Sequence, residues 1–179
     1  MNQVLSLYDR TAVGLDRQAS WMLPTAARLV FAGVLFSYFW ASAGTKLDGL
    51  ITPSLGSYAQ IFPKAFEAAG YDVSKMGLWQ RLVVLVGAWA EYALPLLIVL
   101  GLFTRLAALG MVGFVIVQSL TDIFGHGSAP GAWFDSASDA LLLDQRALWM
   151  LLFLVLIAKG GGPLSADRLF TGIKPSVAA

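Results

Sequence analysis

Residues 82–102 read LVVLVGAWAEYALPLLIVLGL, an apolar stretch of the length that crosses a bilayer as one helix. Its only charged residue is Glu91, close to the middle. An ionised side chain at that depth costs at least about 2.5–3.5 kcal/mol on insertion scales. Glu91 must therefore be neutral, be paired with a cation or face a polar cavity. The stretch predicts a membrane-spanning helix, and Glu91 is its most informative residue for function.

The composition of the whole chain is that of a membrane protein. Of 179 residues, 58% are hydrophobic and 13% are charged, whereas soluble domains carry roughly 25% charged residues. A net charge of +1 and the absence of a Lys/Arg run argue against nucleic-acid binding. The chain has no cysteine, which excludes disulfides, iron–sulfur clusters and thiolate zinc sites carried by the chain itself.

We predict an all-α fold, a polytopic membrane protein with a four-transmembrane-helix bundle in a single membrane domain. Because one pass needs about 20 residues, the length accommodates four passes. We expect spans at residues 23–43, 82–102, 106–123 and 141–159, outer loops at 44–81 and 124–140, a lead-in at 1–22 and a tail at 160–179. The fourth span is the least regular, because its clean apolar core is too short unless the leucines at 141–143 belong to it.

The distribution of basic residues predicts the orientation of the bundle. Arg10, Arg17 and Arg105 lie on one predicted side, together with basic residues of the tail. Short basic loops face the cytoplasm. We therefore expect both termini to be cytoplasmic.

The long first loop carries a helical signal of its own. Apolar residues between Tyr58 and Ala69 recur at helical spacing. Pro63 would interrupt one continuous helix but can open a short one that ends at Gly70. We expect a short amphipathic helix on the outer face.

Glu91 is predicted to face the bundle interior, because Gly87 and Pro95 share its helix face. Arg28, about one turn into the first span, is the partner that we predict for it. One interpretation is a structural pair that fixes helix packing. Another is a site where a proton, an anion or a quinone headgroup meets paired charges, with Arg105 completing a cavity open to lipid. A protonated, hydrogen-bonded Glu91 is the third.

A second polar cluster is predicted near the outer ends of the first and third spans. Gln118 and Asp122 lie one helical turn apart, and Lys46 at the end of the first span could reach Asp122. His126, the only histidine, is expected to be a solvated loop residue. One histidine with one aspartate lacks the ligands that a zinc site requires, so we predict no metal.

Three stretches together resemble the DoxX/DoxD-like family of small four-helix membrane proteins. In and just after the first span, the motif runs from Arg28 through Ser42-Ala43-Gly44-Thr45-Lys46-Leu47, and Glu91 precedes LGLFTRLAAL at residues 100–109. Residues 160–168 read GGGPLSADR and are similar to the family's terminal motif, although the GPG order is not kept and Ala166 replaces the usual leucine. The order of these motifs over nearly the whole chain carries the resemblance.

The resemblance implies a bacterial inner-membrane protein of the kind often associated with oxidoreductases, one member being the small subunit of a thiosulfate:quinone oxidoreductase. Quinone is then the candidate cofactor, with none bound covalently. The expected partners are the lipid bilayer and other membrane or periplasmic subunits, or a second copy of the chain. Because no cysteine or membrane-depth histidine is present, any redox centre must be supplied by quinone or another subunit.

Three functions remain open at this stage. The chain could be a membrane subunit of a quinone-linked oxidoreductase complex, and we do not expect an enzyme on its own. It could be a non-catalytic structural or assembly protein, in which the Arg28–Glu91 pair only holds the bundle. The third function, a proton or small-solute pathway, requires a polar track that joins Asp122, Glu91 and Arg28.

Overall fold

The computed structural model describes residues 2–134 and 142–171 of the chain. Leu141, which we assigned to the fourth span, lies outside the described residues, as do residues 135–140 of the predicted second outer loop and residues 172–179 of the predicted tail. Within the described part the elements are helices joined by loops, as the predicted all-α fold requires.

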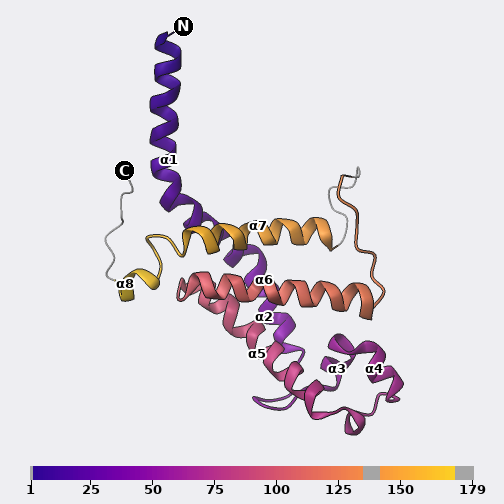
Figure 1. The fold of residues 1–179 in the computed structure, drawn as a ribbon. Helices are drawn as coiled ribbons and strands as arrows, with labels where there is room; N and C mark the ends of the chain where they lie inside the picture. The colour runs from indigo at the N-terminus through magenta and orange to yellow at the C-terminus, as the bar shows by residue number, and fades with distance from the viewer. Residues whose placement is uncertain (1, 135–141, 172–179) are drawn as a thin grey trace.

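The first helical stretch is longer than predicted. Helix α1 (Asn2–Phe31), the π-helical turn η1 (Ala32–Phe36) and α2 (Ser37–Gly44) follow one another without a break. The predicted lead-in is therefore part of the same helix as the first span, and its beginning projects away from the bundle (Figure 1). Pro24 lies inside α1, where a proline removes a backbone hydrogen bond and bends a helix.

The predicted short helix of the first loop is present, and a second helix precedes it. Helix α4 (Pro63–Ala68) begins at the predicted proline, and α3 (Leu55–Ile61) is capped by Ser54, whose hydroxyl accepts the N–H of Ser57. A 3-10 turn, η2 (Val73–Lys75), leads on to the next long helix. A small buried cluster of Tyr58, Phe66 and Val84 packs this loop region onto that helix.

A tight hairpin forms the centre of the fold. Helix α5 (Leu78–Leu100) and α6 (Thr104–Leu120) are joined by residues 101–103, and a π-helical turn, η3 (Thr121–Gly125), continues α6. Helix α5 begins four residues before the predicted position and stops where Gly101 takes a left-handed conformation (φ +69°). We call the side of residues 101–103 the turn end, and the side of residues 45–77 the loop end.

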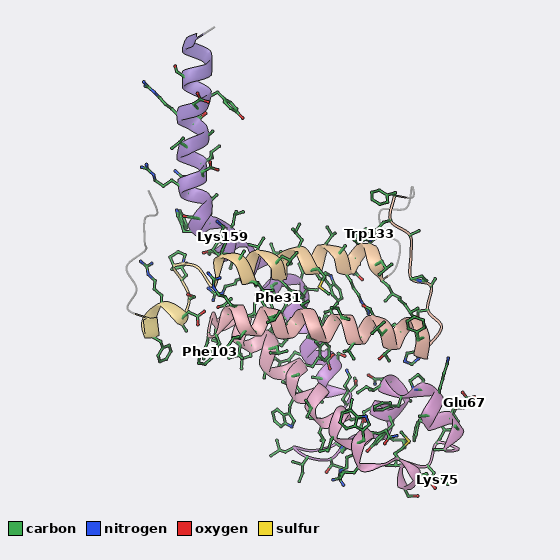
Figure 2. All side chains as sticks on the ribbon, viewed as in Figure 1. Phe31, Glu67, Lys75, Phe103, Trp133 and Lys159 are labelled. Carbon is green, nitrogen blue, oxygen red and sulfur yellow. The ribbon has the colours of Figure 1, made fainter. Side chains whose placement is uncertain are left out.

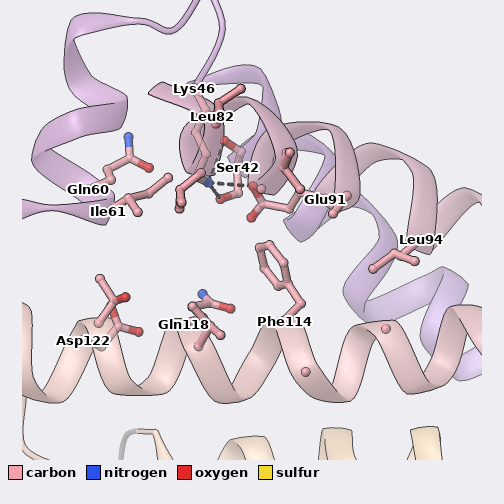
Figure 3. Close-up of a pocket in the computed structure, with 18 of the residues that line it drawn as sticks. Ser42, Lys46, Gln60, Ile61, Leu82, Glu91, Leu94, Phe114, Gln118 and Asp122 are labelled. Carbon is pink, nitrogen blue, oxygen red and sulfur yellow. Dashed lines mark hydrogen bonds and ion pairs between the residues drawn. The ribbon is translucent and has the colours of Figure 1, made fainter. Parts of the chain in front are cut away.

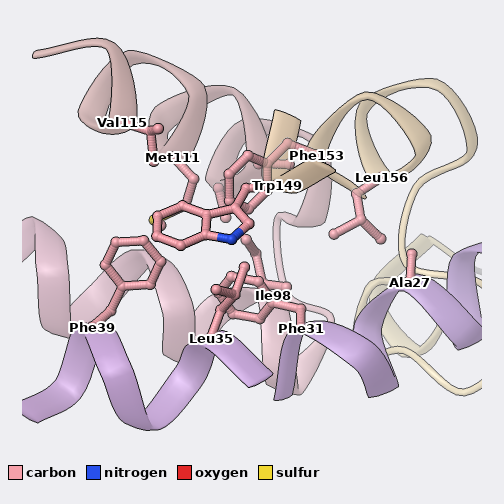
Figure 4. Close-up of a cluster of buried hydrophobic side chains, with 12 residues drawn as sticks. Ala27, Phe31, Leu35, Phe39, Ile98, Met111, Val115, Trp149, Phe153 and Leu156 are labelled. Atoms are coloured by element: carbon pink, nitrogen blue, oxygen red, sulfur yellow. The ribbon is translucent and has the colours of Figure 1, made fainter. Parts of the chain in front are cut away.

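The remaining helices close the bundle around one apolar core. Helix α7 (Leu143–Lys159) packs against α6 and α1, while α2 packs against α5. A short helix, α8 (Asp167–Thr171), follows at the turn end. Aromatic rings from three helices interlock in the core: Phe31 packs edge-on against Phe153, and Phe39 against Trp149 (Figure 4). This packing joins the first helical stretch to α7.

Within residues 2–134 and 142–171, three helices are long and apolar enough to cross a membrane: Tyr8–Gly44, Leu78–Leu100 and Thr104–Gly125. Helix α7 has 17 residues in the described part, so the predicted fourth span is not confirmed at full length. Large apolar side chains such as Leu29, Val34 and Leu106 point outward from the bundle, and side chains project from the helices on all sides (Figure 2). Such a surface suits lipid rather than water.

Candidate functional site

An open cavity of about 620 Å³ lies between α5 and α6, on the side that faces the loop end (Figure 3). Helix α5 lines it from Trp79 to Leu94, and α6 lines it from Gly110 to Gln118. The end of α3 and the turn η3 complete its rim. Most of the wall is apolar, and a few polar side chains project into it.

Glycines decide where the two helices touch and where they separate. A Cβ atom on Gly110 would stand 2.9 Å from Leu94, so α5 and α6 are in close contact there. Gly113 and Gly87 also line the cavity, but a Cβ on either would meet nothing within 4 Å. The hairpin therefore closes at Gly110 and opens toward the loop end, and this opening forms the cavity.

Glu91 lies in the wall of this cavity and pairs with Lys46. The Nζ of Lys46 donates to Glu91 Oε2 over 2.6 Å, and the two residues are 7% and 1% exposed. Lys46 also donates to the hydroxyl and the carbonyl oxygen of Ser42, at 2.7 and 3.2 Å. Figure 3 shows the lysine and glutamate side chains meeting at the cavity wall opposite α6. The arrangement is a buried ion pair beside an apolar space.

The local backbone structure around Lys46 explains why its side chain reaches Glu91. Lys46 follows the last turn of α2, and its side chain runs back along the helix to Ser42, four residues earlier. The backbone beyond it turns at once, because Ser54 N–H donates to the Lys46 carbonyl and the Ser54 hydroxyl donates to the Thr45 carbonyl. The turn fixes the lysine backbone, so its ammonium group is held against α5.

The predicted pairing of Arg28 with Glu91 is wrong. Arg28 is buried at the turn end, where its guanidinium donates to four backbone carbonyls, those of Ile98 and Val99 at the end of α5 and those of Gly161 and Leu164. The last carbonyls of a helix have no partner within the helix, and a guanidinium supplies five donors. These acceptors hold Arg28 two helical turns away from Glu91.

The prediction failed because it assumed that the Arg28 side chain covers the distance along α5 to Glu91. Arg28 instead donates to the carbonyls of Ile98 and Val99, seven and eight positions beyond Glu91. The side chain of Lys46 runs back from the end of α2 to Ser42 and there meets Glu91. A lysine that we placed at the outer end of the first span therefore reaches the middle of α5.

Arg105 is also at the turn end, away from the cavity. Its Nη1 donates to the carbonyl of Ile157 over 2.8 Å, and the residue is exposed. Of the predicted trio Arg28, Glu91 and Arg105, the structure brings only Glu91 to the cavity. Arg28 and Arg105 instead donate to backbone carbonyls at the turn end.

The predicted outer cluster does gather at the cavity, with different partners. Lys46, Gln118 and Asp122 all line it. Gln118 donates to the hydroxyl of Tyr38 over 3.0 Å rather than to a charged group. Asp122 pairs with Arg146 at 2.5 Å, not with Lys46.

Arg146 is a residue that the sequence interpretation missed. It lies in the predicted fourth span (141–159) and is 7% exposed. Besides the Asp122 contact, its Nη1 donates to Ser119 over 2.7 Å, and its guanidinium carbon lies 6.0 Å from the ring centre of Trp149. The signal was available, since Asp122 and Arg146 both lie near the outer ends of their predicted spans.

His126 lies at the rim of the cavity. It is exposed, and its Nε2 lies 2.9 Å from the carbonyl oxygen of Gln60 at the end of α3. Among residues 2–134 and 142–171, no group of three or more His, Asp or Glu side chains is arranged to hold a metal ion. The cavity's chemistry therefore rests on one buried ion pair, the neighbouring amide and hydroxyl groups, and Asp122.

Comparison with known proteins identifies the family of the chain. Neither the curated proteins nor the solved structures that were compared with it gave a match. The family model for DoxX matches residues 23–126, more than half of the chain. The match begins where α1 enters the bundle and includes Lys46, Glu91 and Asp122. The chain belongs to the DoxX family.

Proposed function

We propose that this chain is an integral membrane subunit or accessory protein of a quinone-linked oxidoreductase complex, and that its cavity holds the ring of a quinone. The observation that carries the proposal is the open apolar cavity with the Lys46–Glu91 pair in its wall. Membership of the DoxX family, whose proteins are often linked to oxidoreductases, supports it. We place the chain in the bacterial inner membrane with both termini in the cytoplasm.

The dimensions of the cavity suit a small flat ligand. Pockets for small molecules measure about 300–1,000 Å³ and combine apolar walls with a few polar groups. At about 620 Å³ this cavity falls inside that range. It can take a substituted ring together with the first part of an apolar tail.

The entrance faces the lipid. Val86 on α5 and Val117 on α6 line the cavity and are 68% and 59% exposed, so the gap between these two helices opens sideways. Both helices are long and apolar enough to span a membrane, which makes that side a lipid-facing one. A ligand with an isoprenoid tail would enter from the bilayer and leave its tail among the lipids.

Filling the cavity from α6 tests this proposal. In Gly113→Leu the new side chain would enter open space inside the cavity. We expect the variant, purified from bacterial membranes in mild detergent, to contain about one tenth of the quinone of the wild type or less. The reason is that overlap with a bound ring costs more than about 1.4 kcal/mol. Quinone is measured by solvent extraction and chromatography.

Gly33→Leu is the matched control. Gly33 is exposed in η1, does not line the cavity and also has nothing within 4 Å of an added Cβ. It should retain the wild-type amount of quinone. A wild-type protein that purifies without quinone and without a partner subunit would refute the proposal.

The second candidate is the non-catalytic structural or assembly protein. It is favoured by one observation: each of the three N–H donors of Lys46 has an acceptor within the described part of the bundle. In that case Gly113→Leu would leave growth and partner assembly unchanged. The proton or solute pathway has less support, because Arg28 does not line the cavity that Glu91 and Asp122 share.

A further inference from the structure

The hydrogen-bonding capacity of Lys46 is already in use. An ammonium group has three donors and no acceptor. In this structure Nζ has three acceptors, the Ser42 carbonyl, the Ser42 hydroxyl and Glu91 Oε2. This arrangement fits a charged lysine that neutralises a carboxylate. It leaves no N–H of Lys46 for a ligand.

Glu91, in contrast, keeps an acceptor. Only its Oε2 receives a hydrogen bond from the described residues. Figure 3 shows the carboxylate turning its other oxygen away from Lys46, toward the side of Phe114 and the cavity. A carboxylate oxygen accepts strong, charge-assisted hydrogen bonds and donates none. The polar atom offered at this wall is therefore an acceptor that carries negative charge.

The facing wall offers a second acceptor. Gln118 uses its Nε2 to donate to Tyr38, and its Oε1 is buried with no partner among residues 2–134 and 142–171. A buried carbonyl oxygen without a hydrogen bond costs free energy, and a ligand donor would recover it. Gln118 also projects into the cavity from α6 (Figure 3). Both walls therefore present acceptors to a ligand between them.

We propose that the cavity selects the reduced, hydroxyl-bearing form of its ring ligand, a quinol, whose phenolic O–H donates to Glu91 Oε1. This inference rests on the proposed function and makes it more specific. A quinone ring carries only carbonyl acceptors, so it has no donor to offer to the free oxygen of Glu91 or to the Gln118 oxygen. A quinol supplies the donor that both lack.

The expected preference follows from one hydrogen bond. A hydrogen bond to a charged group is strong enough for about a tenfold or larger change in affinity. The Tyr38 hydroxyl does not remove this difference in affinity, because it can donate to an oxygen of either form. Only the quinol can donate to Glu91. We therefore expect the quinol to bind at least about tenfold more tightly than the matching quinone.

The test compares two oxidation states of one probe. Purified full-length protein in lipid nanodiscs is equilibrated without oxygen with decylubiquinol, and separately with decylubiquinone. Bound ligand is measured after capture of the nanodiscs and corrected for empty nanodiscs. Glu91→Gln keeps an acceptor for Lys46 and gives the cavity an amide donor, so it should abolish or reverse the preference. Glu67→Gln, an exposed carboxylate on α4 outside the cavity, is the charge-matched control and should behave as wild type.

Each outcome decides a separate question. Equal affinity for the two forms, tighter binding of the quinone, or a preference that survives Glu91→Gln would overturn this inference and leave the proposed function standing. Binding of neither form above empty nanodiscs would overturn the proposed function as well. If Glu91→Gln does not fold, the wild-type comparison still decides, and Gln118→Leu should weaken quinol binding several-fold by removing the second acceptor.

Discussion

Glu91 and Lys46 show how a membrane protein can hold a full charge at the middle of a helix. Each side chain is at least 90% buried, and the two neutralise each other across 2.6 Å. Burial of such a pair adds little net stability, because loss of hydration offsets the attraction. Loss of one partner is different, since the remaining charge is then buried without compensation.

Double-mutant cycles should measure this coupling. Lys46→Met alone should destabilise the protein by about 3–5 kcal/mol, because Glu91 would be left unpaired. Lys46→Met combined with Glu91→Leu should recover to within about 1 kcal/mol of wild type, since an apolar pair replaces the ionic one. Stability is measured by denaturant titration in detergent micelles.

The same measurement distinguishes the observed Lys46–Glu91 pair from the predicted Arg28–Glu91 pair. Arg28→Met and Glu91→Leu should be additive within about 0.5 kcal/mol, because these residues share no partner. A coupling between Arg28 and Glu91 as large as that between Lys46 and Glu91 would contradict the structure.

At the scale of elements, the segment after α7 is fastened to the α5–α6 turn. Backbone N–H groups of Ala166 and Asp167 donate to the carbonyls of Leu100 and Gly101. The carboxylate of Asp167 accepts the N–H groups of Phe103 and Thr104 at the start of α6. Asp167 thus caps a helix whose own N-cap residue, Phe103, supplies no side-chain bond.

Gly101 is the residue that permits this docking. Its φ is +69°, and a Cβ there would stand 2.6 Å from Ser165 Cβ and 2.8 Å from Arg28 Cζ. We expect Gly101→Ala to cost at least about 2 kcal/mol, from the left-handed conformation and from the displaced neighbours. Thermal unfolding in detergent measures the loss.

Gly33→Ala is the control for a helical glycine with open space around it. It should be neutral or stabilise the protein by up to about 1 kcal/mol, because alanine lowers the entropy of the unfolded chain. Equal losses in the two variants would mean that Gly101 has no special role.

At the scale of the whole molecule, the features that could be predicted are those that the periodicity of apolar residues encodes. The all-α fold, three apolar spans, the α5–α6 hairpin and the helix opening at Pro63 follow from apolar runs and helix breakers that are local in sequence. The gathering of Lys46, Gln118 and Asp122 near one another was predicted as well.

The ion pairs were not predictable in the same way. They depend on where long side chains end and which acceptors they meet, and an apolar run does not encode either. Counting depth along the spans placed Arg28 within reach of Glu91, but its guanidinium donates to backbone carbonyls at the turn end. Lys46 reaches Glu91 because its side chain runs back along α2.

The predicted orientation can be tested on the intact molecule, since the chain has no cysteine of its own. Single cysteines replace Glu67 on α4, Arg17 on α1 and Arg168 on α8, all exposed. With both termini cytoplasmic, a membrane-impermeant maleimide added to spheroplasts should label the cysteine at 67. It should label those at 17 and 168 only after the membrane is opened.

The cysteine-free protein is the control for background labelling. Labelling of the cysteines at 17 and 67 from the same side would contradict the single pass, at residues 23–43, that we predict between them. Labelling of 17 alone from outside would reverse the orientation.

The four carbonyl contacts of Arg28 also set an order in time. During synthesis Arg28 leaves the ribosome first, and the carbonyls of Ile98 and Val99 follow about 70 residues later. The carbonyls of Gly161 and Leu164 are made 133 and 136 residues after Arg28. The hydrogen bonds of Arg28 at the turn end can therefore be completed only after the segment that follows α7 has been translated. Until then the guanidinium lacks two of its four carbonyl acceptors.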